Sequence, residues 1–176
     1  MKQNLIISAI GQDRPGLVNQ LSNLIIQNNG SIDDSRMTVL AGEFAIIIKV
    51  SADKDKLIDL QNSLKLEMPK IGLDYLSKMS NKAIPTERLI PYNITVLAID
   101  NPGIVNNLSD YFSKLNINII RLQTDCYPAP HTGTPMFSMK MTISLFENVN
   151  ISTIKENFIE LCEELNLDTT FEALTP

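Results

Sequence analysis

The sequence contains no tryptophan, one histidine and two cysteines, and it has no excess of basic residues. Two cysteines cannot build a disulfide framework, so we expect a reducing, cytoplasmic environment. The sequence has 15 Lys and Arg residues and 20 Asp and Glu residues, which gives a net charge of −5. Binding to nucleic acid needs a basic face that replaces phosphate counterions, so this composition argues against direct contact with DNA. An acidic chain can still act on DNA indirectly, by binding a protein that contacts it.

Long hydrophobic runs are also lacking. The apolar run near the N-terminus extends only from Leu5 to Ile10, which is too short for the core of a signal peptide, and no stretch approaches the length of a membrane span. Hydrophobic residues nevertheless make up 44% of the 176 residues, which is enough to bury a core in each of two small domains. No feature of the composition calls for a cofactor, and we expect none.

An internal repeat is the most informative feature of the sequence. The segment DRPGLVN at residues 13–19 recurs as DNPGIVN at residues 100–106, with an offset of 87 residues. Nine of the 20 ungapped positions that begin at Asp13 and Asp100 are identical. Such a match predicts two copies of one module. We therefore expect domains at residues 1–80 and 92–176, joined by a polar linker at residues 81–91.

Each copy is predicted to contain the elements β-α-β-β-α-β. Runs rich in β-branched residues predict strands, and apolar residues at three- and four-residue spacing predict helices. The expected strands are 4–10, 31–39, 43–50 and 71–79, then 92–99, 118–125, 136–144 and 167–173. Helices are expected after each Pro-Gly step and again at about 54–67 and 152–165. This order predicts an α+β fold of two ferredoxin-like modules, each an antiparallel sheet with both helices on one face.

Local signals mark the expected helix ends. Pro15 is predicted to lie just inside the start of the first helix, where its missing N–H is tolerated. Gly30 is predicted to end that helix in the left-handed conformation. Thr153 and Glu156 have the spacing of a capping box at the start of the last helix.

The repeated loop between the first strand and the first helix is the candidate binding site. Glycine allows a ligand to approach closely, and the first-turn N–H groups of the helix can bind a carboxylate. An aspartate just upstream can accept hydrogen bonds from an ammonium group, so the loop suits a small zwitterion. The candidate ligand-binding residues are Asp13, Arg14, Gly16, Leu17 and Val18 in the first copy and Asp100, Asn101, Gly103, Ile104 and Val105 in the second.

The pattern Asp-x-Pro-Gly-[Leu/Ile]-Val resembles the signature of ACT domains, which are βαββαβ modules that bind amino acids and regulate metabolism. The tandem pair resembles the glycine cleavage system transcriptional repressor family, and residues 128–137 resemble that family's insertion between the middle strands of its second domain. The resemblance implies a non-enzymatic regulator with a glycine-like effector, such as glycine or serine, that acts through a separate DNA-binding regulator. Exposed edge strands of such sheets favour a homodimer.

Three alternatives stay open at this point. The loops can be purely structural, which would leave an interaction module that regulates by contact alone. Because Arg14 is replaced by Asn101 in the second copy, the copies can also differ in what they bind. An enzyme using Cys126 and His131 is a remote alternative, since the sequence offers no third group to orient the pair. Nothing near His131 completes a metal-ligand set either, so we expect no metal site.

Overall fold

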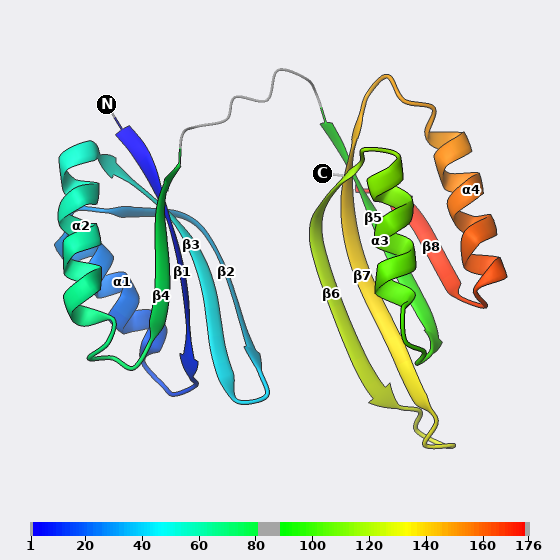
Figure 1. Cartoon of the computed structure of the whole chain (residues 1–176), viewed down its shortest axis with the longest axis horizontal. Helices are drawn as coiled ribbons and strands as arrows, with labels where there is room; N and C mark the ends of the chain where they lie inside the picture. Colours follow the sequence, from blue (N-terminus) through cyan, green and yellow to red (C-terminus); the bar gives the residue numbers. More distant parts are fainter. Residues whose placement is uncertain (1, 81–88, 175–176) are drawn as a thin grey trace. The chain divides into compact units, whose positions relative to one another are not determined.

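The computed structural model describes residues 2–80 and 89–174, and the chain divides between residues 84 and 85 into two compact units. Each unit contains the predicted β-α-β-β-α-β order (Figure 1). The elements of the first unit are β1 (Lys2–Gln12), α1 (Leu17–Gln27), β2 (Ser31–Leu40), β3 (Glu43–Asp53), α2 (Lys54–Glu67) and β4 (Asp74–Ser80). Those of the second are β5 (Leu89–Ile99), α3 (Ile104–Lys114), β6 (Asn118–Pro128), β7 (Pro135–Phe146), α4 (Ile151–Glu164) and β8 (Asp168–Ala173).

The first unit is an antiparallel sheet with strand order β2-β3-β1-β4, and both helices cover one of its faces (Figure 1). Successive side chains of a strand point to opposite faces, so Leu5, Ile7 and Ala9 of β1 are buried under the helices while the intervening residues are not. Helix α1 contributes buried residues at helical spacing, namely Leu17, Leu21, Leu24 and Ile25. The core therefore lies between the sheet and its two helices, and the opposite face of the sheet is open.

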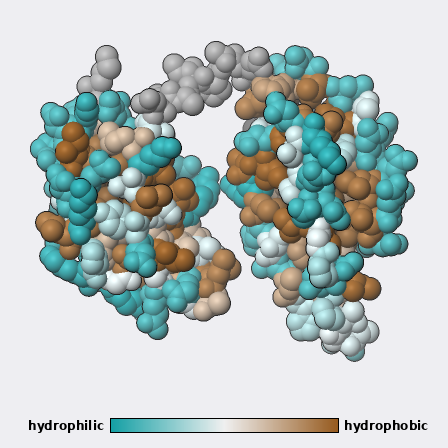
Figure 2. Space-filling view, in the orientation of Figure 1, coloured by the Kyte–Doolittle hydropathy of each residue, from teal (hydrophilic) through white to brown (hydrophobic). Residues whose placement is uncertain are grey.

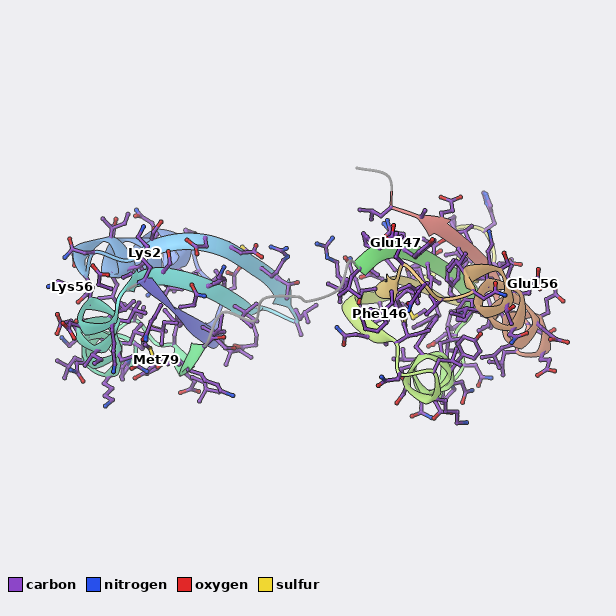
Figure 3. The ribbon with its side chains drawn as sticks, turned by 90° about the horizontal axis from the view of Figure 1, so that it is seen from above. Lys2, Lys56, Met79, Phe146, Glu147 and Glu156 are labelled. Atoms are coloured by element: carbon purple, nitrogen blue, oxygen red, sulfur yellow. The ribbon has the colours of Figure 1, made fainter. Side chains whose placement is uncertain are left out.

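The second unit repeats this arrangement, with strand order β6-β7-β5-β8 and antiparallel pairing throughout. Its core contains more aromatic residues. Phe112 of α3 stacks on Phe158 of α4, with ring centroids 5.1 Å apart, and Phe158 also contacts Phe171 of β8. The exposed Lys56 on α2 and Glu156 on α4 lie on the outer sides of their helices (Figure 3). The tandem ferredoxin-like fold expected from the sequence is confirmed. No helix in the described part of the chain is long and apolar enough to cross a membrane.

The ends of α1 differ from the predictions. The helix begins at Leu17, with Gly16 as its N-cap, so Pro15 lies before the helix and not inside its first turn. At the other end Asn29 takes the left-handed conformation, with φ of 58°, and Gly30 does not. Glycine is needed at position 30 for space, because a Cβ there would lie 2.8 Å from Val50 and 2.9 Å from Ile25.

The start of α4 and two strand boundaries also need correction. The side chain of Asn150 caps α4 by accepting a hydrogen bond from the N–H of Thr153 at 3.3 Å, so Thr153 is not the capping residue. Strand β4 begins at Asp74, three residues later than predicted. Strand β5 begins at Leu89 and includes the last three residues of the expected linker. The rest of that linker, residues 81–88, lies outside the described residues.

The edge strands β2 and β6 each contain one irregularity. The pairing of β2 with β3 shifts between Ile32 and Asp34, and the pairing of β6 with β7 shifts between Ile119 and Arg121. One residue therefore bulges from each edge strand, Asp33 in the first unit and Ile120 in the second. A bulge of this kind bends the strand and increases its local twist.

Candidate functional site

The two repeated loops adopt the same backbone conformation. Gly16 and Gly103 are the N-caps of α1 and α3, with φ of 95° and 97°. These values lie in the left-handed region that glycine enters without the penalty of a Cβ. The carbonyl oxygens of Gly16 and Gly103 accept the first hydrogen bonds of the two helices, from the N–H groups of Gln20 and Asn107, both at 2.9 Å. The Pro-Gly step thus turns the chain from the strand into the helix.

Both loops lead to helix starts with no side-chain cap. Neither Gly16 nor Gly103 has a side chain that could accept a hydrogen bond from the first turn, and neither first turn contains an acidic residue. The first N–H groups of each helix therefore lack the usual cap acceptor, at the end where the helix dipole favours negative charge.

A cleft of about 490 Å³ lies beside the first loop and contains all five residues predicted for this copy. It opens between the start of α1 and the neighbouring strands β2 and β3. Its lining comprises Asp13, Arg14, Gly16, Leu17 and Val18, together with Asn19, Ser22, Met37 and Phe44. The last four were missed by the sequence reasoning. A signal existed for two of them, since Asn19 and Ser22 are identical to Asn106 and Ser109 in the repeat.

The corresponding loop of the second copy lines a different opening. This cleft, of about 300 Å³, lies between the loop and the turn that follows α4, where Leu165, Asn166 and Leu167 complete it. Of the predicted residues, Asp100, Asn101 and Ile104 line it, whereas Gly103 and Val105 do not. The two loops therefore share a backbone conformation, while the clefts of about 490 and 300 Å³ beside them have different linings.

Arg14 accounts for part of this difference. Its guanidinium donates one hydrogen bond to the carbonyl oxygen of Ile71 at 3.0 Å and another to the side chain of Gln20 at 3.1 Å. The first bond connects the loop to the segment between α2 and β4, and the second connects it to α1. Asn101, at the same place in the second copy, makes no such bond in the described part of the chain. Arg14 thus holds the loop in place through its hydrogen bonds and also contributes a positive charge to the lining of the cleft.

Three predicted residues differ strongly in exposure. Leu17 is 2% exposed and Ile104 is 7% exposed, and both belong to the cores of their units. Val18 is 48% exposed beside the first cleft. We conclude that Leu17 and Ile104 position their loops by packing, while Val18 presents an apolar surface to the first cleft.

The contacts of Cys126 do not resemble those of a nucleophile. Desolvation by the surrounding protein, with the carboxylates of Asp100 and Asp125 nearby, raises the pKa of the Cys126 thiol. A raised pKa disfavours the reactive thiolate. His131 and Cys126 form no hydrogen bond with each other within the described ranges. Residues 2–80 and 89–174 also contain no group of three or more His, Cys, Asp or Glu side chains that could hold a metal ion.

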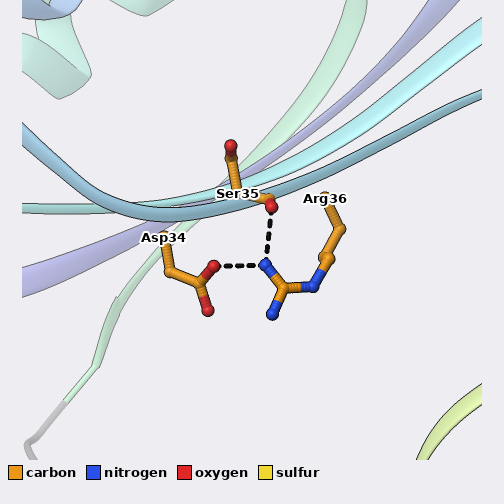
Figure 4. Close-up of polar contacts among 3 residues, drawn as sticks. All are labelled: Asp34, Ser35 and Arg36. Carbon is orange, nitrogen blue, oxygen red and sulfur yellow. Dashed lines mark hydrogen bonds and ion pairs between the residues drawn. The ribbon is translucent and has the colours of Figure 1, made fainter.

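The charged side chains at the start of β2 have partners either within β2 or on the neighbouring strand β3. Arg36 forms an ion pair with Asp34 and donates to the carbonyl oxygen of Ser35 at 2.7 Å (Figure 4). The bulged Asp33 accepts a hydrogen bond from the Ser51 hydroxyl at 2.8 Å and lies 3.5 Å from the Lys49 ammonium. The Ser51 hydrogen bond is the largest cause of the lowered pKa of Asp33.

The fold and its paired loops define a tandem βαββαβ module, and comparisons with known proteins agree. A family model of the ACT domain matches residues 3–75. A UPF0237 protein of Methanocaldococcus jannaschii is 37% identical over 68 residues, which cover 39% of this chain and 73% of the relative. The glycine cleavage system transcriptional repressor of Escherichia coli (strain K12) is 26% identical over 164 residues, covering 92% of this chain and 85% of the relative.

A crystal structure of a protein from Galdieria sulphuraria has a TM-score of 0.83 with this chain and is 26% identical, covering 99% of this chain and all of its own. This chain belongs to the ACT-domain family and contains two ACT modules in tandem. Over nearly its whole length it resembles the glycine cleavage system transcriptional repressor.

Proposed function

We propose that the chain is a non-enzymatic, cytoplasmic regulator that binds a small amino acid, such as glycine or serine, at the first cleft. The observation that carries the proposal is the convergence of all five predicted residues of the first copy on one opening of about 490 Å³. This volume is ordinary for a small-molecule site. Asp13 supplies a carboxylate for the ammonium group of the ligand, and the uncapped start of α1 supplies donors for its carboxylate.

The regulatory output is contact with a separate DNA-binding regulator. The similarity to a transcriptional repressor supports a role in transcription, and the net charge of −5 argues against direct DNA binding by this chain. A ligand can shift a conformational equilibrium only by its differential affinity for the two states. The occupied and empty forms must therefore present different surfaces to the regulator.

Calorimetric titration with the proteinogenic amino acids, beginning with glycine and serine, tests the proposal. We expect saturable binding that Asp13→Ala abolishes and Asp100→Ala leaves in place, because all five predicted residues of the first copy line one cleft and only three of the second copy line theirs. Asp74→Ala, at an exposed carboxylate on β4, is the matched control and is expected to bind normally. Loss of binding in Asp100→Ala alone would assign the ligand to the second copy.

Two other outcomes would replace the proposal. Flat titrations across the whole panel would favour an interaction module that regulates by contact alone. Loss of the regulatory effect in Cys126→Ala and in His131→Ala, with folding and partner binding both intact, would revive the enzyme alternative. The raised pKa of the Cys126 thiol argues against that alternative.

We further propose that the chain forms a homodimer through the edge strand β2. The charges at the start of this strand are satisfied within the first unit, whereas Met37, Val39 and Leu40 near its end are 50%, 44% and 67% exposed. An edge strand with unpaired backbone groups and exposed apolar side chains is suited to pairing with another strand.

A further inference from the structure

The hairpin formed by β6 and β7 is longer than its counterpart in the first unit. In the first hairpin Leu40 pairs with Glu43, and two residues make the turn between them. In the second hairpin Pro128 pairs with Pro135, and residues 129–134 come between them. These six residues, which we name the knob, project past the other strands of their sheet (Figure 1). Because the first unit closes the same hairpin with two residues, the fold itself does not require the knob.

The knob is internally ordered. The N–H of Ala129 donates to the carbonyl oxygen of Thr134 at 2.8 Å, and the N–H of Gly133 donates to the carbonyl oxygen of Ala129 at 2.9 Å. The hydroxyl groups of Thr132 and Thr134 are 2.9 Å apart and share a hydrogen bond. A segment that is already folded loses less conformational freedom on binding than a flexible one. Such a preformed, exposed projection is suited to recognition.

The chemistry of the knob narrows the class of partner. It contains no Asp, Glu, Lys or Arg, and it combines proline, threonine, glycine and alanine with His131. Figure 2 shows this end of the second unit mostly in the pale colours of intermediate hydropathy. Without Lys or Arg it lacks the side chains that usually neutralise phosphates, which argues against nucleic acid and against an anionic membrane surface. Its single proline, Pro130, and its two hydroxyl groups instead suit a protein recess that offers apolar walls and a few hydrogen-bonding groups.

We infer that residues 129–134 are a contact site for a partner protein, which receives the knob in an uncharged recess. The inference rests on the proposed regulation by protein contact and adds the surface that makes the contact. The base of the knob is connected to the second loop, since the N–H of Asp100 donates to the carbonyl oxygen of Pro135 at 2.9 Å. The knob therefore occupies a defined place relative to that loop.

The first hairpin supplies the design of the test variant. The Ala-Gly variant replaces residues 128–135 by Leu-Ala-Gly-Glu, the sequence of residues 40–43, and so gives the second hairpin the two-residue closure of the first. Pro128 and Pro135 are replaced as well because proline lacks the N–H that such a turn needs. Thr132→Glu is a second variant, which keeps the main-chain hydrogen bonds of the knob, removes the Thr132 hydroxyl and adds one charge at an exposed position. Thermal unfolding of both variants establishes that any loss of binding is not a loss of folding.

The experiment begins with photo-crosslinking in cells of the source organism. A photoreactive residue is placed at Thr132 in the full chain, or at Ala41 as the control in the first hairpin. We expect an adduct with a different protein from position 132 and not from position 41. That protein is then purified and titrated with the full chain. We expect the Ala-Gly variant and Thr132→Glu to bind it at least about tenfold more weakly. Its affinity for the unchanged chain should vary little between about 50 and 500 mM salt, since no ion pair is involved.

Several results would overturn the inference: no protein adduct at position 132, an adduct only with a second copy of this chain, or equal affinities for the unchanged and the shortened chain. The proposed function is tested separately by the identity of the partner. If the partner needs the knob for binding but is not a DNA-binding regulator, the proposed regulatory output is refuted and the inference about the knob stands. If a DNA-binding regulator binds the shortened chain as tightly as the unchanged chain, the proposed regulatory output stands and the inference about the knob is refuted.

Discussion

The main-chain N–H of Asp100 donates a hydrogen bond to the carbonyl oxygen of Pro135 at 2.9 Å, just as the N–H of Asp13 does to Gly42 at 2.9 Å. Each repeated loop is thereby fixed to the hairpin of its own unit. Because these bonds use the main chain, replacing either aspartate side chain by alanine leaves them in place. The Asp13→Ala variant therefore leaves the main-chain anchor of its loop in place. Asp100→Ala keeps the corresponding main-chain bond but also removes the contact of the Asp100 carboxylate with the Cys126 thiol.

The first prediction concerns the glycines at the helix starts. Gly16→Ala and Gly103→Ala should each lower the free energy of unfolding by about 1–2 kcal/mol, because alanine is strained at a φ of 95° or 97°. Beyond the adjacent residues no atom approaches closer than 4.0 Å to a Cβ at either position, so the cost comes from the local backbone and not from contacts with the rest of the fold. Urea titration of each variant measures it. An unchanged midpoint for both variants would show that the left-handed conformation is not required.

A second prediction separates the observed cap of α4 from the predicted one. Asn150→Ala should reduce stability by about 0.5–2 kcal/mol, because the N–H of Thr153 loses its acceptor. Thr153→Ala, at the residue that the capping-box pattern indicated, should have a smaller effect. Thermal unfolding of the two variants makes the comparison. A larger loss of stability in Thr153→Ala than in Asn150→Ala would support the predicted capping box at Thr153.

The third prediction is a dependence of stability on pH. Burial raises the pKa of the Cys162 thiol from 9.0 to about 11. The unfolded chain therefore loses this proton at a lower pH than the folded chain, so the wild type should lose stability as the pH rises from about 9 to about 11. The loss should stay below about 3 kcal/mol.

Cys162→Ala is the control for this effect. It removes the thiol but keeps every other titrating group, so the stability difference between wild type and variant should shrink over the same pH window. Unfolding measured by urea at several pH values gives this difference. A constant difference from pH 8 to pH 11 would mean that Cys162 does not titrate differently in the folded and unfolded states.

The fourth prediction addresses the proposed homodimer. The double variant Met37→Lys with Val39→Lys places two like charges on the exposed part of β2, which should oppose pairing with a second copy. Light scattering after gel filtration should then shift from a dimer toward the 19.6 kDa monomer. Ile58→Lys, at a 44% exposed apolar residue of α2, should leave the dimer intact. A dimer that persists in the double variant would exclude β2 as the interface.

The repeat predicted most of the fold because the same hydrophobic pattern occurs twice, and alternation along strands such as β1 is a local property of the sequence. The errors occur where several residues can satisfy one backbone requirement. The left-handed residue after α1 is Asn29 and not the predicted Gly30, because asparagine also tolerates that conformation. The need for glycine at position 30 comes from the packing of Val50 and Ile25, which depends on tertiary structure.

The candidate site was predicted unevenly for a related reason. The loop residues follow from the motif, but Met37 and Phe44 enter the first cleft from strands that the sequence does not place beside the loop. The motif likewise gives no indication that the second loop opens toward the turn after α4. Which neighbours complete a site depends on packing between elements distant in the sequence.

The bulges of the edge strands β2 and β6 lie at equivalent positions of the two modules. Asp33 and Ile120 have unrelated side chains, yet they are 87 residues apart, which is the offset of the repeated motif. The irregular edge is therefore a property of the module's backbone, and it does not depend on which side chain occupies the bulged position.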